Sequence, residues 1–468
     1  MAGPATTSAL PNSLASRDIA YHVHPYTNQS TFPSEGPLIV CRGEGVRVFD
    51  DSGNAYFDAL AGLWCCNLGF GNDERLLKAA TRQLTDLPFY HTFAAKTSDT
   101  AIKLAEKIIS LAPVPMSKVL FANSGSESND TAIKLMWYYN NALGRPHKKK
   151  IISRIKGYHG VTVATASLTG LPNNQRDFDL PIAGILHAGC PHHYRFARPG
   201  ESEDDFATRC AADLEQLILS EGPDTVAGFF GEPVMAAGGV IVPPASYWPK
   251  IQAVLRKYDI LLLADEVVCG FGRTGNPWGC QTFGIKPDMI TIAKGLSAAY
   301  LPISALMISE PIYQAIVEES AKIGVFGHGY TYAGHPAAAA VALETQKIYE
   351  DRGVFENARR MAPLLQEALG RFAAHPLVGE KRGIGFIGAL EIVKNKATRE
   401  VFAPADAVAA YVAKRAQAHG VIVRVIGDSI PFCPPLIMEP GELEDMMTRF
   451  GRALDEAHDM AKRRKLVA

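Results

Sequence analysis

The chain has 468 residues, with 47% hydrophobic residues, 20% charged residues and a formal net charge of -1. A chain of this length exceeds one ordinary core, so we expect two or three lobes, and the composition is globular rather than disordered. Because the charge is nearly balanced and Lys and Arg are scattered, the sequence excludes a basic nucleic-acid or membrane-surface footprint. A small molecule is the expected partner.

The N-terminal stretch MAGPATTSALPNSLASRD has no basic segment followed by an apolar one. No stretch approaches the roughly 18 apolar residues of a membrane span. We therefore expect a soluble, cytoplasmic protein. The eight cysteines contain no C-x-x-C spacing, which favours reduced thiols over a disulfide framework.

The first predicted element is a hairpin in residues 37–60 that turns at Asp51, Ser52 and Gly53. Farther along, short apolar runs alternate with helical periodicity, which predicts an α/β fold with a mostly parallel sheet. Apolar residues at three-and-four spacing predict helices over 128–142 and 203–220. The predicted strands cover residues 118–122, 149–155, 225–230, 259–264, 289–293 and 304–309.

From about Gly334 the pattern changes to a long helix, followed by further helices and short strands. We therefore predict a large domain over residues 63–333 and a smaller α+β domain over 334–468. Residues 1–62 are predicted to form an N-terminal segment that contributes to the small domain.

Lys294 stands at the end of a predicted buried strand, between the apolar residues 290–293 and Gly295. Burying an ammonium group costs several kcal/mol. Considered alone, the residue is therefore best explained by a strand that ends there with its side chain in solvent.

The other predicted strands are also followed by polar residues, at the edge where open α/β sheets bind ligands. NSGSES (123–128) predicts a phosphate site, because free amides and the helix dipole attract anions, or else a plain helix cap at Ser126. Asp265 stands at the end of its strand. It is explained either by a cofactor site or by a salt bridge or cap at the sheet edge. Tyr158 and His159 also have ordinary structural explanations, as a core aromatic and a surface or capping residue.

One group accounts for these residues together. Pyridoxal phosphate (PLP) needs an anchored phosphate, a contact for its flat ring, a carboxylate for its ring nitrogen and a lysine that forms an imine. A lysine bound in this way need not carry an ammonium charge, so Lys294 then fits a buried strand end.

The motifs SGSESND, GYHG, EPV, LLLADEVVCGFGRTG, IAKGL and YTYAGHP together resemble the class III aminotransferases, the omega-transaminases of fold-type I PLP enzymes. The likeness runs from about residue 30 to 455, and FDALAGLW and LPFYHTF are most similar to the amine:pyruvate branch. The resemblance implies a large domain whose mostly parallel central sheet is flanked by helices, with a smaller α+β domain.

The resemblance also implies residue roles. Lys294 would be the Schiff-base lysine and proton shuttle, and Asp265 the partner of the pyridine nitrogen. Thr331 would reach the phosphate of a neighbouring subunit, and Arg424 would bind a carboxylate or swing away for an uncharged amine. The remaining cofactor-binding residues would be Ser124, Gly125, Ser126, Tyr158, His159, Glu232, Val267 and Tyr330, and the pocket would be walled by Trp64, Phe93 and Tyr158. Without the resemblance, Arg424 would be a surface residue and Trp64 a core residue.

The implied activity is transfer of an amino group from a primary amine or omega-amino acid (putrescine-, beta-alanine- or arylalkylamine-like) to pyruvate. Ping-pong kinetics and a homodimer, or a tetramer, are implied as well. Some positions depart from the family pattern and leave the donor open: Ser128, Met235, Ala236, Ala298, Ala299, Pro431, Phe432 and Cys433.

Other functions remain as alternatives. An aminomutase, epimerase or decarboxylase would use the same fold and cofactor. GFGRTG (270–275) matches a dinucleotide fingerprint, but it does not turn directly from strand into helix. His22-x-His24 and Cys190-x-His192-His193 have no second ligand pair at useful spacing, so we expect solvated loop residues and no metal site.

Overall fold

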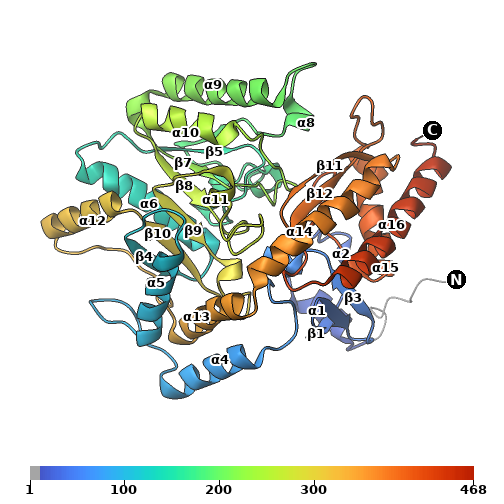
Figure 1. Cartoon of the computed structure of the whole chain (residues 1–468), viewed down its shortest axis with the longest axis horizontal. Helices are drawn as coiled ribbons and strands as arrows, with labels where there is room; N and C mark the ends of the chain where they lie inside the picture. The colour runs from blue at the N-terminus through green and yellow to red at the C-terminus, as the bar shows by residue number, and fades with distance from the viewer. Residues whose placement is uncertain (1–10, 468) are drawn as a thin grey trace.

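The computed structural model describes residues 11–467 (Figure 1). Its central sheet has seven strands in the order β4-β10-β9-β8-β7-β5-β6. All neighbours from β9 to β6 pair in parallel, and β10 runs antiparallel to both β4 and β9. The predicted mostly parallel sheet is therefore confirmed. The strands are β4 (Lys118–Ala122), β5 (Lys150–Arg154), β6 (Ile185–Ala188), β7 (Val226–Gly231), β8 (Leu261–Asp265), β9 (Met289–Ile292) and β10 (Ser304–Ile308).

Helices pack on both faces of this sheet. Adjacent residues of β7 point into separate cores: Phe229 packs with residues of α9 and α10, whereas Phe230 packs with residues of α6 and α12. Strands that are buried on both faces read as continuous apolar runs, which is why most of them could be predicted. The four helices are α6 (Gly125–Ala142), α9 (Glu203–Glu221), α10 (Tyr247–Lys257) and α12 (Glu310–Ile323).

The long helix predicted after residue 334 is α13 (Pro336–Asp351). It packs against α4 (Glu74–Asp86) and α5 (Asp99–Leu111), two helices of the predicted large domain. In Figure 1, α13 lies just above α4, in the lower part of the molecule. This helix therefore contacts the large lobe, although the predicted boundary assigns it to the small one.

The second lobe is built on a three-stranded antiparallel sheet, β11-β12-β14, comprising Val378–Ile384, Ile387–Ile392 and Ser429–Phe432. Helix α14 (Val354–Arg371) packs on β11 and β12, and α15 (Val408–Ala418) packs on α16 (Pro440–Arg463).

The N-terminal strands lie beside this lobe, blue against red in Figure 1. β3 (Ala55–Asp58) pairs in parallel with β13 (Val421–Ile422), so Phe57 lies opposite Val421. The predicted hairpin is a three-stranded meander, because β1 (Val40–Glu44) turns at Gly45 into β2 (Arg47–Asp50). The remaining helices are α1 (Leu14–Tyr21), α2 (Phe32–Glu35), α3 (Ala61–Trp64), α7 (Val163–Leu168), α8 (His193–Phe196) and α11 (Gly279–Phe283). Within residues 11–467 no helix has the length and apolar character needed to cross a membrane.

Candidate active site

The predicted phosphate site lies where β4 passes into α6. Ser124 is the N-cap of α6, and its Oγ accepts a hydrogen bond from the Glu127 amide at 3.2 Å. The expectation that Ser126 caps the helix is therefore wrong; Ser126 lies in the first turn, where its Oγ accepts from the Val161 amide at 3.2 Å. First-turn amides have no acceptor inside a helix. The amides of Gly125 and Ser126 can thus receive a phosphate at the positive end of the helix dipole.

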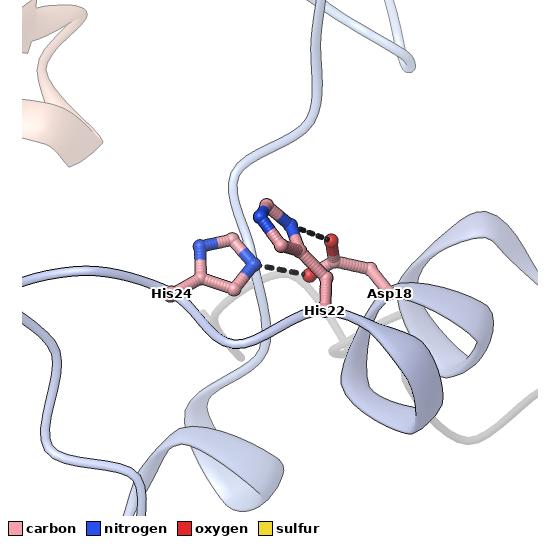
Figure 2. A group of neighbouring side chains, drawn as sticks. All are labelled: Asp18, His22 and His24. Carbon is pink, nitrogen blue, oxygen red and sulfur yellow. Dashed lines mark hydrogen bonds and ion pairs between the residues drawn. The ribbon is translucent and has the colours of Figure 1, made fainter.

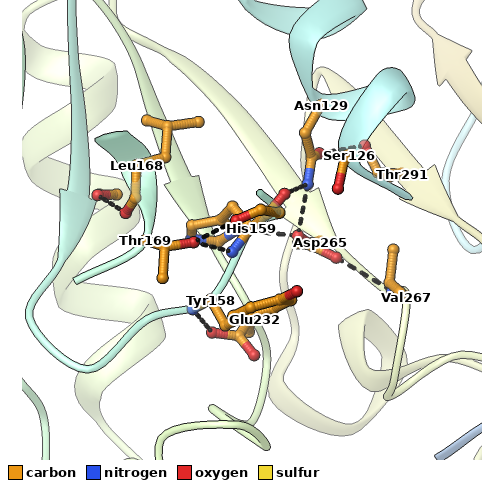
Figure 3. A network of polar contacts seen from close by, with 12 residues as sticks. Ser126, Asn129, Tyr158, His159, Leu168, Thr169, Glu232, Asp265, Val267 and Thr291 are labelled. Carbon is orange, nitrogen blue, oxygen red and sulfur yellow. Dashed lines mark hydrogen bonds and ion pairs between the residues drawn. The ribbon is translucent and has the colours of Figure 1, made fainter. Parts of the chain in front are cut away.

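Asp265, the last residue of β8, is held by three contacts (Figure 3). Its Oδ2 accepts from Asn129 Nδ2 at 2.8 Å, and His159 Nδ1 lies 2.8 Å from the same oxygen. Within residues 11–467 Oδ1 accepts only the longer bond from the Val267 amide, at 3.2 Å. This carboxylate therefore keeps acceptor capacity for a further N–H group.

Two residues of this network were not predicted from the sequence. Asn129 on α6 also donates to the His159 carbonyl at 2.8 Å, and its own oxygen accepts from Thr291 Oγ1 at 2.8 Å. Thr291 on β9 thereby fixes the orientation of the amide that holds Asp265. Asn129 lies four residues after Gly125, on the same face of α6, and this spacing was a usable signal.

Lys294 lies two residues after the end of β9 and has a left-handed backbone, with φ +47°. Such a conformation is unfavourable for a lysine and persists only where its surroundings impose it. Burial lowers the pKa of the Lys294 amine, and the Asp265 carboxylate opposes this shift. Within residues 11–467 its Nζ has no hydrogen bond or salt bridge, so the amine is free for a ligand.

Glu232 follows β7 and lies below the same network. Its Oε1 accepts from the Tyr158 amide at 3.0 Å, and burial raises the pKa of the Glu232 carboxyl to about 7. This contact sets the backbone position of Tyr158. Gly157 is required here, because a Cβ at this position would lie 2.9 Å from the Arg154 carbonyl oxygen.

Three of the four predicted substrate residues come together. The Arg424 guanidinium lies 5.7 Å from the centre of the Trp64 ring, and its charge acts on the hydroxyl of Tyr158. Burial and the neighbouring Tyr26 raise the pKa of Tyr158. Tyr26 was not predicted from the sequence. The centre of its ring lies 5.3 Å from the Arg424 guanidinium carbon, and its hydroxyl accepts a hydrogen bond from Asn174 Nδ2 at 2.6 Å. Its position in an irregular N-terminal segment gave no sequence signal.

Phe93 does not join this group within one chain. It is 44% exposed and lies against Gly329, near the predicted cofactor residues Tyr330 and Thr331. The Tyr330 hydroxyl donates to the Glu127 carbonyl at 3.0 Å in the first turn of α6, whereas Thr331 is exposed. Phe93 and Thr331 therefore belong to an exposed surface beside the first turn of α6, apart from Trp64, Tyr158 and Arg424.

Several atypical positions lie near the predicted site residues. Ala236 and Cys433 are fully buried in the cluster that contains Trp64. Ser128 Oγ lies 2.8 Å from Ser304 Oγ, which donates to the Ser124 carbonyl at 2.7 Å, so this serine supports the phosphate turn. Ala298 and Ala299 are both left-handed, with φ +48° and +67°. Glycine is better suited to this conformation.

The two alternative motifs have structural explanations. After β8, GFGRTG forms turns, and the next helix, α11, begins only at Gly279; the buried Arg273 donates to Asn67 at 2.6 Å and to the Pro434 carbonyl. The expectation of solvated residues at Cys190-x-His192-His193 is wrong for the first two, because Cys190 and His192 are buried. His192 Nε2 lies 2.8 Å from Glu380.

Comparison with known proteins gives the family. The family description "Aminotransferase class-III" matches residues 31–454. The chain belongs to the class III aminotransferases. A gamma aminobutyrate transaminase 3, chloroplastic, from Solanum lycopersicum is 47% identical over 98% of this chain and 89% of that protein. The omega transaminase from Pseudomonas jessenii in complex with PMP is 56% identical, with a TM-score of 0.94 over 96% of this chain and 99% of that chain. A transaminase solved with L-alanine is 54% identical, with a TM-score of 0.89 over 90% of this chain and all of that chain.

Class III aminotransferases use pyridoxal 5'-phosphate, and the residues present fit this group. The free Lys294 amine, the incompletely bonded Asp265 and the open first turn of α6 supply its three requirements. The chain is therefore a PLP-dependent aminotransferase, with amino transfer as its reaction class.

Proposed function

We propose that this aminotransferase moves the amino group of a primary amine or omega-amino acid to pyruvate. The observation that carries the proposal is the environment of Arg424. Its guanidinium lies against the rings of Tyr26 and Trp64, and within residues 11–467 it forms no salt bridge with a carboxylate of the chain. An unpaired guanidinium at an aromatic pocket is suited to bind the carboxylate of a keto acid or amino acid.

The names of the relatives support this substrate class. The tomato relative is named for gamma-aminobutyrate, and one solved relative contains L-alanine. L-Alanine is the amino acid that pyruvate becomes when it accepts an amino group. Trp64, Tyr26 and Tyr158 can contact the apolar part of a donor, while Arg424 serves a carboxylate when one is present.

Each residue of the site has a separate role in the proposed reaction. When bound, PLP supplies an aldehyde and an electron-accepting ring, which acidify the carbon next to the donor nitrogen. The Lys294 amine can hold this proton and move it between substrate and cofactor, because burial favours its neutral form. Asp265, oriented by Asn129 and His159, would pair with the ring nitrogen, and the first turn of α6 would hold the phosphate.

Donor and acceptor use the same pocket in turn, so we propose ping-pong kinetics. Initial rates at several fixed pyruvate concentrations should give parallel double-reciprocal lines; intersecting lines contradict the proposal. A panel of putrescine, beta-alanine, gamma-aminobutyrate and an arylalkyl amine tests the substrates. The proposal predicts alanine from pyruvate at a higher rate than glutamate from 2-oxoglutarate. An activity that needs no acceptor would instead indicate a decarboxylase, epimerase or aminomutase.

A homodimer with shared active sites is part of the proposal. Residues 87–93 and 325–332 form an exposed apolar surface, in which the rings of Phe89 and Tyr332 lie 5.6 Å apart. Thr331 and Phe93 belong to this surface, next to the α6 turn. We place both residues in the site of the neighbouring subunit, and a tetramer would repeat the same dimer.

Mixed dimers test this arrangement. Lys294→Ala and Thr331→Asp should each remove most activity as homodimers, the second because a negative charge repels phosphate. A mixed dimer with one substitution per chain should regain about half of one dimer's activity if Thr331 serves its partner, because one site is then intact. No recovery would show that Thr331 acts within its own chain or that sites are not shared.

The cytoplasmic location also stays a prediction. The tomato relative is named as chloroplastic. Fractionation of the source cells, with the activity followed in each fraction, would decide between cytosol and organelle.

A further inference from the structure

A cluster of three metal-binding side chains lies outside the active site, at the N-terminal helix (Figure 2). Asp18 is on α1, His22 caps the C-terminal end of this helix, and His24 follows in the next loop. His22 Nδ1 lies 3.1 Å from one carboxylate oxygen of Asp18, and His24 Nε2 lies 2.6 Å from the other. The two imidazole rings therefore point at one carboxylate from two sides.

The sequence pattern alone did not reveal this cluster. His22 and His24 form a pair with no second pair at metal-ligand spacing. Folding supplies the missing ligand, because Asp18 lies four residues before His22 and the last turn of α1 brings their side chains to one face. The expectation that both histidines are merely solvated thus overlooked a carboxylate one helical turn away.

We propose that Asp18, His22 and His24 bind a divalent transition metal of the zinc class, with water completing the coordination. The possible ligand atoms all lie within 4.8 Å of one another. Zinc bonds to nitrogen and oxygen of about 2.0–2.2 Å place tetrahedral ligands roughly 3.3 Å apart, so small side-chain movements suffice. Two imidazoles and one carboxylate give a borderline-to-hard ligand set with open positions, and the two imidazoles favour zinc or nickel over calcium or magnesium.

The charge and exposure of the cluster support a metal. Within residues 11–467 Asp18 contacts His22 and His24 but no lysine or arginine, so no fixed positive charge opposes a cation at this carboxylate. The side chains of Asp18, His22 and His24 are 23%, 61% and 27% exposed, so a hydrated ion has access.

A second cluster of possible metal ligands is unsuitable for binding a cation. His192, Glu380 and Glu391 are also close together. However, Arg382 donates to both carboxylates at 2.7 Å, and Arg195 lies 2.8 Å from Glu391. These arginines already neutralise the carboxylates, so the second cluster is an ion-pair network and would repel a cation.

The position of the proposed site links it to the substrate pocket. His24 lies two residues before Tyr26, whose ring contacts Arg424. A metal bound by Asp18, His22 and His24 would hold the loop after α1 against the end of this helix. The centre of the His24 ring also lies 4.5 Å from that of Phe32, so the chain is restrained on both sides of Tyr26. Zinc binding should therefore reduce backbone hydrogen exchange in residues 18–26.

Calorimetric titration of the tag-free holoenzyme with zinc chloride, and separately with nickel chloride, tests the proposal. We expect one ion per chain. His22→Ala and His24→Ala should each weaken binding at least about tenfold, since losing a mere hydrogen-bond partner of a ligand already costs about 10- to 100-fold. His147→Ala, which removes another exposed histidine, should leave binding unchanged.

A further variant tests whether the thiols of the chain bind the zinc instead. Cys66→Ala should not change the affinity, whereas unchanged binding in His22→Ala and His24→Ala would overturn the proposal. Absence of binding to the wild-type holoenzyme at millimolar zinc would overturn it as well. Reduced hydrogen exchange in residues 18–26 of the wild type, but not of His22→Ala, would support the site independently of affinity and of turnover.

Discussion

His159 Nδ1 lies 2.8 Å from Oδ2 of Asp265, and both side chains are buried. His159 Nε2 has no partner within residues 11–467, so the ring can act as a neutral donor through Nδ1. The contact between the imidazole and Oδ2 therefore helps to orient the carboxylate.

Removing this donor should weaken cofactor binding. A hydrogen bond to a charged group contributes about 1.5–3 kcal/mol, so His159→Phe should raise the dissociation constant for PLP about 10- to 100-fold. Equilibrium dialysis followed by absorbance would measure it. His187→Phe is the matched control, because His187 contacts the Leu168 carbonyl instead. Equal losses in both variants would show a general packing effect.

Replacing Arg424 should affect the two half-reactions differently. In Arg424→Leu, the pyruvate half-reaction should lose about 10- to 100-fold in kcat/KM, because a charge-assisted contact is lost. The half-reaction with an arylalkyl amine, which has no carboxylate, should change less than about threefold. Single-turnover absorbance measures both. Arg449→Leu is the control, since Arg449 also lies near an aromatic ring, that of Phe57, but outside the pocket. Equal slowing of both half-reactions would contradict the role of Arg424.

Cys65 should react at unusually low pH. Its Sγ lies 3.9 Å from that of Cys66, and the hydrogen bond from Cys66 lowers the pKa of the Cys65 thiol to about 6. Alkylation of Cys65 by iodoacetamide should therefore rise through pH 6 and level off above pH 7, because only the thiolate reacts. In Cys66→Ala this rise should move to higher pH. Peptide mass spectrometry measures it, with Cys41 as an exposed reference; identical profiles in both proteins would refute the prediction.

Ala299→Gly should stabilise the protein. Ala299 is exposed with φ +67°, and a left-handed conformation costs a non-glycine residue about 1–2 kcal/mol. The greater conformational freedom of glycine in the unfolded chain offsets about 0.4–1 kcal/mol of the stability gained by relieving this strain. A net gain of about 0 to 1.6 kcal/mol in the free energy of unfolding should appear in urea unfolding. Ala212→Gly, in the exposed part of α9, should have the opposite sign. Destabilisation by both substitutions would show that the strain at 299 is not relieved.

The sequence predicted the parts of the fold that are marked by continuous burial. Strands β7, β8 and β9 are buried along their whole length and appear as uninterrupted apolar runs. β6 was missed because two of its four residues are only half-buried, one of them His187. Strand β1 was not predicted as a separate strand because a single glycine, Gly45, marks its turn into β2.

Within the site, residues at the ends of strands could be predicted and residues that act through them could not. Asp265 and Lys294 stand out because charged residues are unusual after apolar runs. Asn129, Thr291 and Tyr26 are unremarkable in sequence, and their roles arise from contacts between segments 100 or more residues apart. Asp18 and His22 had a helical spacing that would have predicted their contact.

The central claim is that PLP is attached to Lys294 opposite Asp265. Borohydride reduction of the holoenzyme, followed by proteolysis and mass spectrometry, tests it most directly. We predict one stable pyridoxyl adduct per chain on Lys294, absent from Lys294→Ala, with the other lysines unmodified. An unmodified Lys294, or an adduct on a different lysine, would contradict this account of the site.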